Sequence, residues 1–188
     1  MEFQQRKYRQ LIQKPDKSNI GGRDARIIDL CEKINKNKRY YTTSSCAGRI
    51  VLVKESLDKK PDKFLFRTHD KINFKGLKKV LLDIEKSKEL KIIDFQQEPC
   101  ILHVACFDIV CAQELIDKAK QVGWKKSGIM ASRKRFVVEL NSTEEMSFPI
   151  MHRGKILVND DFLRLVVKEA NKRLEQTWKK IENLRKLV

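Results

Sequence analysis

The sequence lacks the features that direct a chain to a membrane or a secretory compartment. No stretch approaches the roughly 18–20 apolar residues that a helix needs to cross a bilayer. The first residues, 1–6, lack the apolar core of a signal peptide. The five cysteines are odd in number and no pair has C-x-x-C spacing, so we expect free thiols and no zinc or other metal site. A cytoplasmic protein without membrane contact is the expectation.

Glycine-rich nucleotide motifs are also absent. The chain has 7 glycines, and they form neither the dinucleotide fingerprint nor the Walker lysine loop. No serine lies in a G-x-S-x-G nucleophile elbow. These absences exclude the commonest nucleotide-binding designs, including the glycine loop of Rossmann-like methyltransferases.

Positive charge dominates what is present. The 188 residues include 41 Lys+Arg and 25 Asp+Glu, which gives a formal net charge of +16. A field of this sign recruits polyanions such as nucleic acids. The alternative is a lysine-rich solvated surface without a specific partner. The 41% hydrophobic content supports a globular fold, and the length suits one domain, residues 1–188.

Apolar periodicity predicts an α/β (α+β-like) fold with a mixed central β-sheet flanked by helices. The patterns switch repeatedly between strand and helix spacing, and a long helix with several basic faces closes the chain. That helix either docks on the fold with a solvated basic face, or binds the RNA backbone, or packs against a partner helix or a second copy of the chain. Helices are predicted at 2–13, around 27–34, after the N-cap Asn73, from the N-cap Asp108 to Gly123, and at 160–188. Strands are predicted at 50–53, 63–68, 90–96, 101–107, 124–131, 135–140, 146–151 and 155–158.

Residues 41–50 are the most distinctive stretch. Hydroxyls and a thiol run into a glycine–arginine pair, a composition typical of a loop that receives an anion. Glycine permits close backbone approach, and arginine binds phosphate or carboxylate with two donors. The predicted binding residues of this loop are Ser44, Ser45, Cys46, Gly48 and Arg49.

Further polar residues interrupt apolar strands. His103 lies inside a predicted strand and His69 at the end of another, and each is either a satisfied core histidine or an acid–base group. Ser132 and Arg133 belong to a basic turn that is either solvated or in contact with phosphate. Cys46 as a nucleophile needs an activating base that the spacing does not identify, so we interpret it as pocket lining.

Residues 40–50 resemble the signature of the tRNA wybutosine-synthesizing protein 3 family. The order of the later segments fits the same family, including residues 98–104, the helix that ends at Gly123, residues 127–129 and residues 170–172. The resemblance spans about residues 3–185. Ala47 stands where the family usually has serine, which argues against an essential side-chain oxygen at that position.

The resemblance implies a compact α/β fold that is not Rossmann-like and an S-adenosylmethionine-dependent methyltransferase. Such enzymes methylate the N4 nitrogen of a wyosine-type base 3′ of the anticodon in tRNA-Phe, and the archaeal members serve shorter wyosine pathways. The implied partner is the anticodon stem-loop, and we expect a monomer or weak homodimer. A non-catalytic RNA-binding module and an enzyme on a small acidic metabolite are the alternatives.

Within that resemblance, His103 is the first candidate base and His69 the second. Arg49 would bind the carboxylate of the methyl donor, or a carboxylate or phosphate of the nucleotide. Ser44 and Ser45 would donate hydrogen bonds in the same loop. Arg133, beside Ser132, would make a second anion contact.

Overall fold

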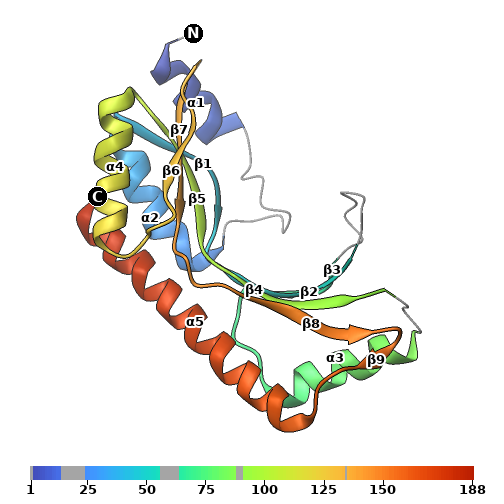
Figure 1. Ribbon diagram of the computed structural model, residues 1–188. Coiled ribbons are helices and arrows are strands. Elements are labelled where there is room, and N and C mark those ends of the chain that lie inside the picture. Colours follow the sequence, from blue (N-terminus) through green and yellow to red (C-terminus); the bar gives the residue numbers. More distant parts are fainter. Residues whose placement is uncertain (1, 14–23, 56–63, 88–90, 134) are drawn as a thin grey trace. The chain divides into compact units, whose positions relative to one another are not determined.

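Two antiparallel sheets organise the chain. The computed structural model describes residues 2–13, 24–55, 64–87, 91–133 and 135–188. The described residues fall into two compact units, each built on one sheet (Figure 1). The first unit comprises Met1–Ala47, Pro99–Thr143 and Thr177–Val188, and the second comprises Gly48–Glu98 and Glu144–Gln176.

The α/β class is confirmed, but the single mixed sheet is wrong. The described strands form two sheets, and all of their pairings are antiparallel. Only Ala47 and Gly48 separate the last strand residue of one sheet from the first of the other. Gly48 has φ of 90°, a backbone conformation that favours glycine. Hydrophobic periodicity reports that a strand exists and carries no information on which sheet it joins.

The first unit holds a four-stranded sheet in the order β1-β5-β7-β6. One face forms the larger core with α2, α4 and the end of α5, around residues such as Leu30, Leu102 and Trp124. On the other face, Phe3 of α1 packs on Tyr41, with ring centroids 5.1 Å apart. The elements are α1 (Phe3–Gln13), α2 (Ala25–Lys36), α4 (Ile109–Gln121), β1 (Tyr40–Cys46), β5 (Ile101–Cys106), β6 (Gly128–Ala131) and β7 (Phe136–Asn141).

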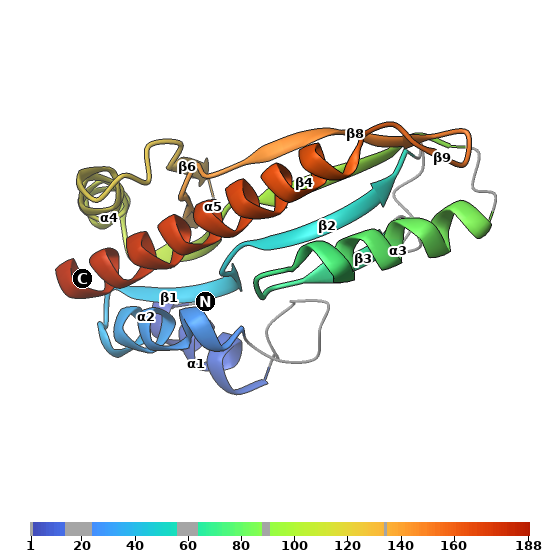
Figure 2. The same cartoon turned by 90° about the horizontal axis from the view of Figure 1, so that it is seen from below.

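The second unit holds a five-stranded sheet in the order β3-β2-β4-β8-β9. Figures 1 and 2 show α3 and the first part of α5 on the same side of this sheet. Phe162 of α5 packs edge-on against Phe148, which stacks on Phe95. The elements are β2 (Arg49–Lys54), β3 (Phe64–Thr68), β4 (Ile93–Glu98), β8 (Met146–His152), β9 (Lys155–Ile156) and α3 (Phe74–Lys86).

Local sequence signals placed most boundaries correctly. Asn73 caps α3 by accepting from the amide of Gly76 at 2.8 Å, and Asp108 caps α4 by accepting from that of Cys111 at 2.7 Å. The predicted strand at 124–131 begins only at Gly128, because residues 124–127 form a turn. Residues 14–22, where the sequence between the first two helices predicts a loop, lie outside the described residues. The largest error concerns residues 41–50, where β1 continues through Cys46 instead of forming a loop.

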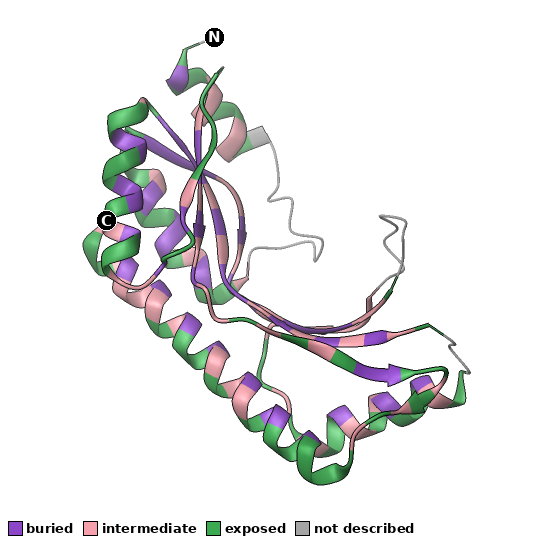
Figure 3. Ribbon diagram, in the orientation of Figure 1, coloured by how far each residue is buried: buried purple, intermediate pink, exposed green. Residues whose placement is uncertain are grey.

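The long terminal helix α5 (Asp160–Leu187) belongs to the second unit up to Gln176 and to the first from Thr177. In the second unit Asn171 clamps the backbone of Ile72, donating to its carbonyl at 2.8 Å and accepting from its amide at 3.0 Å. Figure 3 shows that the buried residues of α5 recur along one side of the helix. They are Leu163, Val166, Val167, Ala170, Leu174, Thr177, Ile181 and Leu184.

Lys180 ties α5 to the end of α4 within the first unit. Its ammonium donates to the carbonyl of Gly123 at 3.1 Å and to that of Ser142 at 2.8 Å. The Lys180 carbonyl accepts from the indole of Trp124 at 3.2 Å. Gly123 has φ of 96°, and a Cβ there would lie 2.9 Å from Cε of Lys180. The positive φ therefore favours glycine here, and a Cβ would in addition displace the end of the flexible Lys180 side chain.

We expect Gly123→Ala to lower the free energy of unfolding by about 1–2 kcal/mol, because an L-residue is strained at positive φ. Urea denaturation measures this change. Gly128→Ala is the matched control, since a Cβ at Gly128 meets nothing within 4 Å. Equal stability of the two variants would contradict this explanation.

Burial raises the pKa of the Tyr40 phenol to about 12 and that of the Cys106 thiol to about 12. The folded state therefore keeps protons that the unfolded chain releases at lower pH. Stability from these groups is fully present below the unfolded pKa values, 9.0 for the thiol and 10.0 for the phenol, and is lost as pH rises toward the folded ones.

We expect the free energy of unfolding to fall steadily above about pH 9, and Cys106→Ala to make that fall shallower. Urea titrations at a series of pH values, compared between the wild type and the variant, measure the slope. Identical slopes would show that the Cys106 thiol does not contribute.

Candidate active site

An irregularity in β1 decides which of its side chains share a face with β5. Thr42 lies opposite Val104 and Ser44 opposite His103, so Thr43 is an extra residue in the strand. Asn35 holds this segment: its side-chain oxygen accepts from the Thr42 amide at 2.8 Å, and its side-chain nitrogen donates to the Thr42 hydroxyl at 3.0 Å. A shift by one residue reverses the faces of a strand. The bulge therefore places Ser44, rather than Thr43, beside the His103 ring.

Ser44, His103 and Glu139 form a hydrogen-bonded line across three neighbouring strands. Ser44 Oγ lies 2.7 Å from Nδ1 of His103, and Nε2 of His103 lies 2.9 Å from Oε2 of Glu139. The three residues are opposite one another in register on β1, β5 and β7, which run side by side in Figure 1. The His103 and Glu139 side chains are 26% and 33% exposed, so the line is accessible from solvent.

This arrangement can move a proton. A carboxylate only accepts hydrogen bonds, so Glu139 fixes the proton of His103 on Nε2. Nδ1 then accepts from the Ser44 hydroxyl. A proton removed from a substrate at Ser44 Oγ can therefore pass to His103, and Glu139 stabilises the imidazolium that forms.

The other residues of the predicted loop have different environments. Ser45 lies opposite Leu102 and is 6% exposed. It belongs to the covered face, the one that packs against α2 and α4, and so does not share the face of Ser44. Cys46 lies opposite Ile101 on the His103 face. Ala47 is buried, and its amide donates at 3.3 Å to Asp24, the residue that caps α2. Ala47 therefore makes this contact through its backbone and not through its side chain.

Arg49 belongs to the second unit, where it begins β2. Its Nε forms an ion pair with the carboxylate of Glu98, directly opposite on β4. Its guanidinium carbon lies 5.1 Å from the ring centroid of Phe64, and that of Arg67 lies 5.7 Å from the same centroid. His69, the second candidate base, follows β3 in the same unit and is half-buried. The structure thus brings Ser44 together with His103, and Arg49 together with Glu98.

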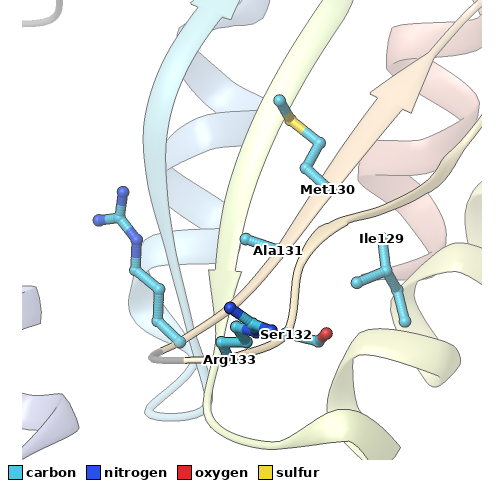
Figure 4. Close-up of a pocket in the computed structure, with 6 residues that line it drawn as sticks. Ile129, Met130, Ala131, Ser132 and Arg133 are labelled. Carbon is cyan, nitrogen blue, oxygen red and sulfur yellow. The ribbon is translucent and has the colours of Figure 1, made fainter.

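Ser132 and Arg133 lie at the end of the β6–β7 hairpin in the first unit. They line a surface pocket together with Ile129, Met130, Ala131 and Arg135, as Figure 4 shows. Lys134, the third residue of the predicted basic turn, lies outside the described residues. Gly128, at the start of β6, is opposite Glu139 in register. The hairpin therefore begins beside the hydrogen-bonded line of Ser44, His103 and Glu139, which we call the relay.

Two functional residues escaped the sequence interpretation. Glu139 lies in an apolar strand, the same signal that drew attention to His103, and that signal could have identified it. Asn35 sits in an ordinary helix, and its role depends on a contact that the sequence does not reveal. Within the described residues, no group of three or more His, Cys, Asp or Glu side chains could hold a metal ion. None of the described helices is long and apolar enough to span a membrane.

A serine, a histidine and a carboxylate in one hydrogen-bonded line that solvent can reach are typical of an enzyme that moves a proton. The family model described as methyltransferase TYW3 matches residues 4–188. The chain therefore belongs to the TYW3 methyltransferase family, whose members use S-adenosylmethionine as methyl donor. The family predicted from residues 40–50 is thereby confirmed.

Individual relatives agree with this assignment. The chain is 35% identical over 187 residues to the tRNA wybutosine-synthesizing protein 3 homolog of Danio rerio, covering 96% of this chain and 72% of that protein. It is 35% identical over 170 residues to the tRNA(Phe) 7-((3-amino-3-carboxypropyl)-4-demethylwyosine(37)-N(4))-methyltransferase 2 of Thermococcus kodakarensis, covering 87% and 78%. The solved structure of the PH1069 protein from Pyrococcus horikoshii matches with a TM-score of 0.86 and 28% identity, over 98% of this chain and 93% of that one.

Proposed function

We propose that this chain transfers a methyl group from S-adenosylmethionine to the N4 nitrogen of a wyosine-type base, 3′ of the anticodon, in tRNA-Phe. The line of hydrogen bonds from Ser44 through His103 to Glu139 is the observation that carries the proposal. The name of the Thermococcus kodakarensis relative describes N4 methylation of a demethylated wyosine derivative in tRNA-Phe. The net charge of +16 supports an RNA substrate.

Proton removal is the step that the protein's own residues perform. S-adenosylmethionine, when bound, would supply an electrophilic methyl group, and its sulfur would keep the electron pair of the methyl–sulfur bond as that bond breaks, leaving S-adenosylhomocysteine. As the bond between nitrogen and methyl forms, the N–H bond breaks and its proton passes to Ser44 Oγ. The proton of Ser44 moves to Nδ1 of His103, beside Glu139. His103 is preferred to His69 as the base because its ring already has this serine and this carboxylate in place.

Arg49 and Glu98 suit the amino-acid group of a ligand. S-adenosylmethionine carries an ammonium and a carboxylate on one carbon, and this ion pair offers a guanidinium and a carboxylate to match them. The two side chains are 24% and 30% exposed, so a ligand can reach them. The base named for the Thermococcus kodakarensis relative carries the same 3-amino-3-carboxypropyl group. Arg49 would therefore bind the donor or the substrate base through identical chemistry.

The remaining residues of the motif have supporting roles. Cys46, on the His103 face, lines the site, and Gly48 allows the chain to turn at the end of β1. Ser45 supports β1 from the covered face. We propose that residues 1–188 work as one domain, because the family model runs through both units and α5 belongs to both. The anticodon stem-loop as partner and a monomer or weak homodimer stay predictions.

The direct test supplies labelled S-adenosylmethionine and tRNA-Phe that carries the demethylated base. We expect the wild type to methylate it and His103→Gln to lower kcat about 100-fold to 10,000-fold, the usual contribution of a positioned base. His152→Gln, at an exposed histidine of β8, is the matched control and should keep full activity. No methylation by well-folded wild type would refute the function, and an active His103→Gln would refute the relay.

We expect Arg49→Gln to weaken binding of one ligand about tenfold or more, because the variant cannot donate a charged hydrogen bond. Calorimetry with S-adenosylmethionine and anisotropy with the stem-loop RNA show which ligand is affected. Lys155→Gln, an exposed cation of the same unit, is the control. Unchanged affinity for both ligands would show that Arg49 binds neither of them. Melting temperature should change little, since partly exposed ion pairs contribute at most about 1 kcal/mol.

A further inference from the structure

The pocket at the end of the β6–β7 hairpin combines exposed apolar side chains with arginines. Met130 and Ile129 are 59% and 40% exposed, so two neighbouring apolar side chains are open to solvent beside the arginines. Figure 4 shows that these two side chains come from the strand, whereas Ser132 and Arg133 come from the turn. Arg135 adds a second guanidinium, and none of the residues that line the pocket is acidic.

We infer that this pocket binds the RNA backbone next to the target base. It rests on the proposed function, which gives the substrate as RNA. Arginine side chains bind the phosphate, the Ser132 hydroxyl donates to it, and the apolar side chains contact the adjoining nucleoside. Single-stranded RNA is recognised in this mixed way, by charge on the backbone and by apolar contact with splayed bases.

Strand β7 connects the hairpin pocket to Glu139 of the relay. Gly128 and Glu139 pair in the row of the relay, and the hairpin extends from that row toward Arg135. Arg135 is four residues from Glu139, which is about 13 Å along an extended strand. Both features belong to the first unit and are joined by β7 itself. A nucleotide held at the hairpin end would therefore flank the nucleotide whose base lies at Ser44.

The carboxylate of the methyl donor is a rival ligand for the same arginines. The composition of the pocket favours RNA, because it is formed on a surface hairpin and pairs two guanidinium groups with exposed apolar residues. A single amino-acid carboxylate uses one guanidinium and leaves Met130 and Ile129 without a role. Separate measurements of donor and RNA affinity distinguish the two ligands.

The test measures anisotropy of a labelled anticodon stem-loop RNA of tRNA-Phe with the full chain, between about 50 and 200 mM salt. We expect the double variant Arg133→Gln and Arg135→Gln to bind about tenfold or more weakly. Its salt dependence should be flatter by about 0.7 for each phosphate that the variant no longer neutralises. Arg133→Lys with Arg135→Lys retains the charge and should recover most of the affinity. Met130→Ser should weaken binding without changing the salt slope.

Lys125→Gln is the matched control, because Lys125 is an exposed cation of the same unit outside the pocket. It should reduce affinity less than the pocket variants do, while S-adenosylmethionine affinity stays unchanged in all of them. Wild-type RNA affinity in the double Gln variant, or a weaker donor affinity instead, would overturn the inference. If the wild type binds RNA through the hairpin but never methylates it, the proposed function fails and the pocket assignment stands.

Discussion

One extra residue in β1 is the constraint on which the candidate site depends. Thr43 interrupts the pairing with β5, and Asn35 fixes the position of the interruption through the backbone and side chain of Thr42. Without the bulge, Ser44 would point into the covered face and a threonine would face His103. The candidate arrangement therefore depends on a contact between α2 and β1 that lies two residues before Ser44. A strand, unlike a loop, holds Ser44 in a narrow range of positions, which suits proton transfer.

The distinctive motif at residues 41–50 contributes to two different sheets. Its serines lie on β1 in the first sheet, and its arginine begins β2 in the second. Ala47 and Gly48 connect them, and the amide of Ala47 is held by the cap of α2. This division explains the composition of the motif better than an anion-binding loop does. The small residues meet the demands of a bulge, a buried turn and a change of sheet, and only Ser44 reaches the relay.

Local signals predicted the local structure, and long-range pairing escaped them. Asn73, Asp108 and Gly123 mark helix ends because caps depend on neighbours within a few residues. His103 and Ser44 were recognised separately from their residue types. Their alignment needs the register of two strands about 60 residues apart, which alternation alone does not determine. The pairing of Arg49 with Glu98 is hidden for the same reason, and Glu139 was overlooked although it interrupts an apolar strand.

In the proposed function, the relay and the hairpin pocket divide catalysis and recognition along a single strand. Glu139 orients His103, and the same strand β7 leads to the turn that carries the pocket. Hydrogen bonds to β5 and β6 on its two sides hold β7 in place, so a ligand on the hairpin is positioned relative to the relay without moving a lid. The chemistry then needs little reorganisation once the nucleotide is bound. Because the relay is already formed, the binding energy of the RNA is not needed to assemble it and can contribute to selecting the nucleotide. This suits the proposed modification of one base in a large RNA.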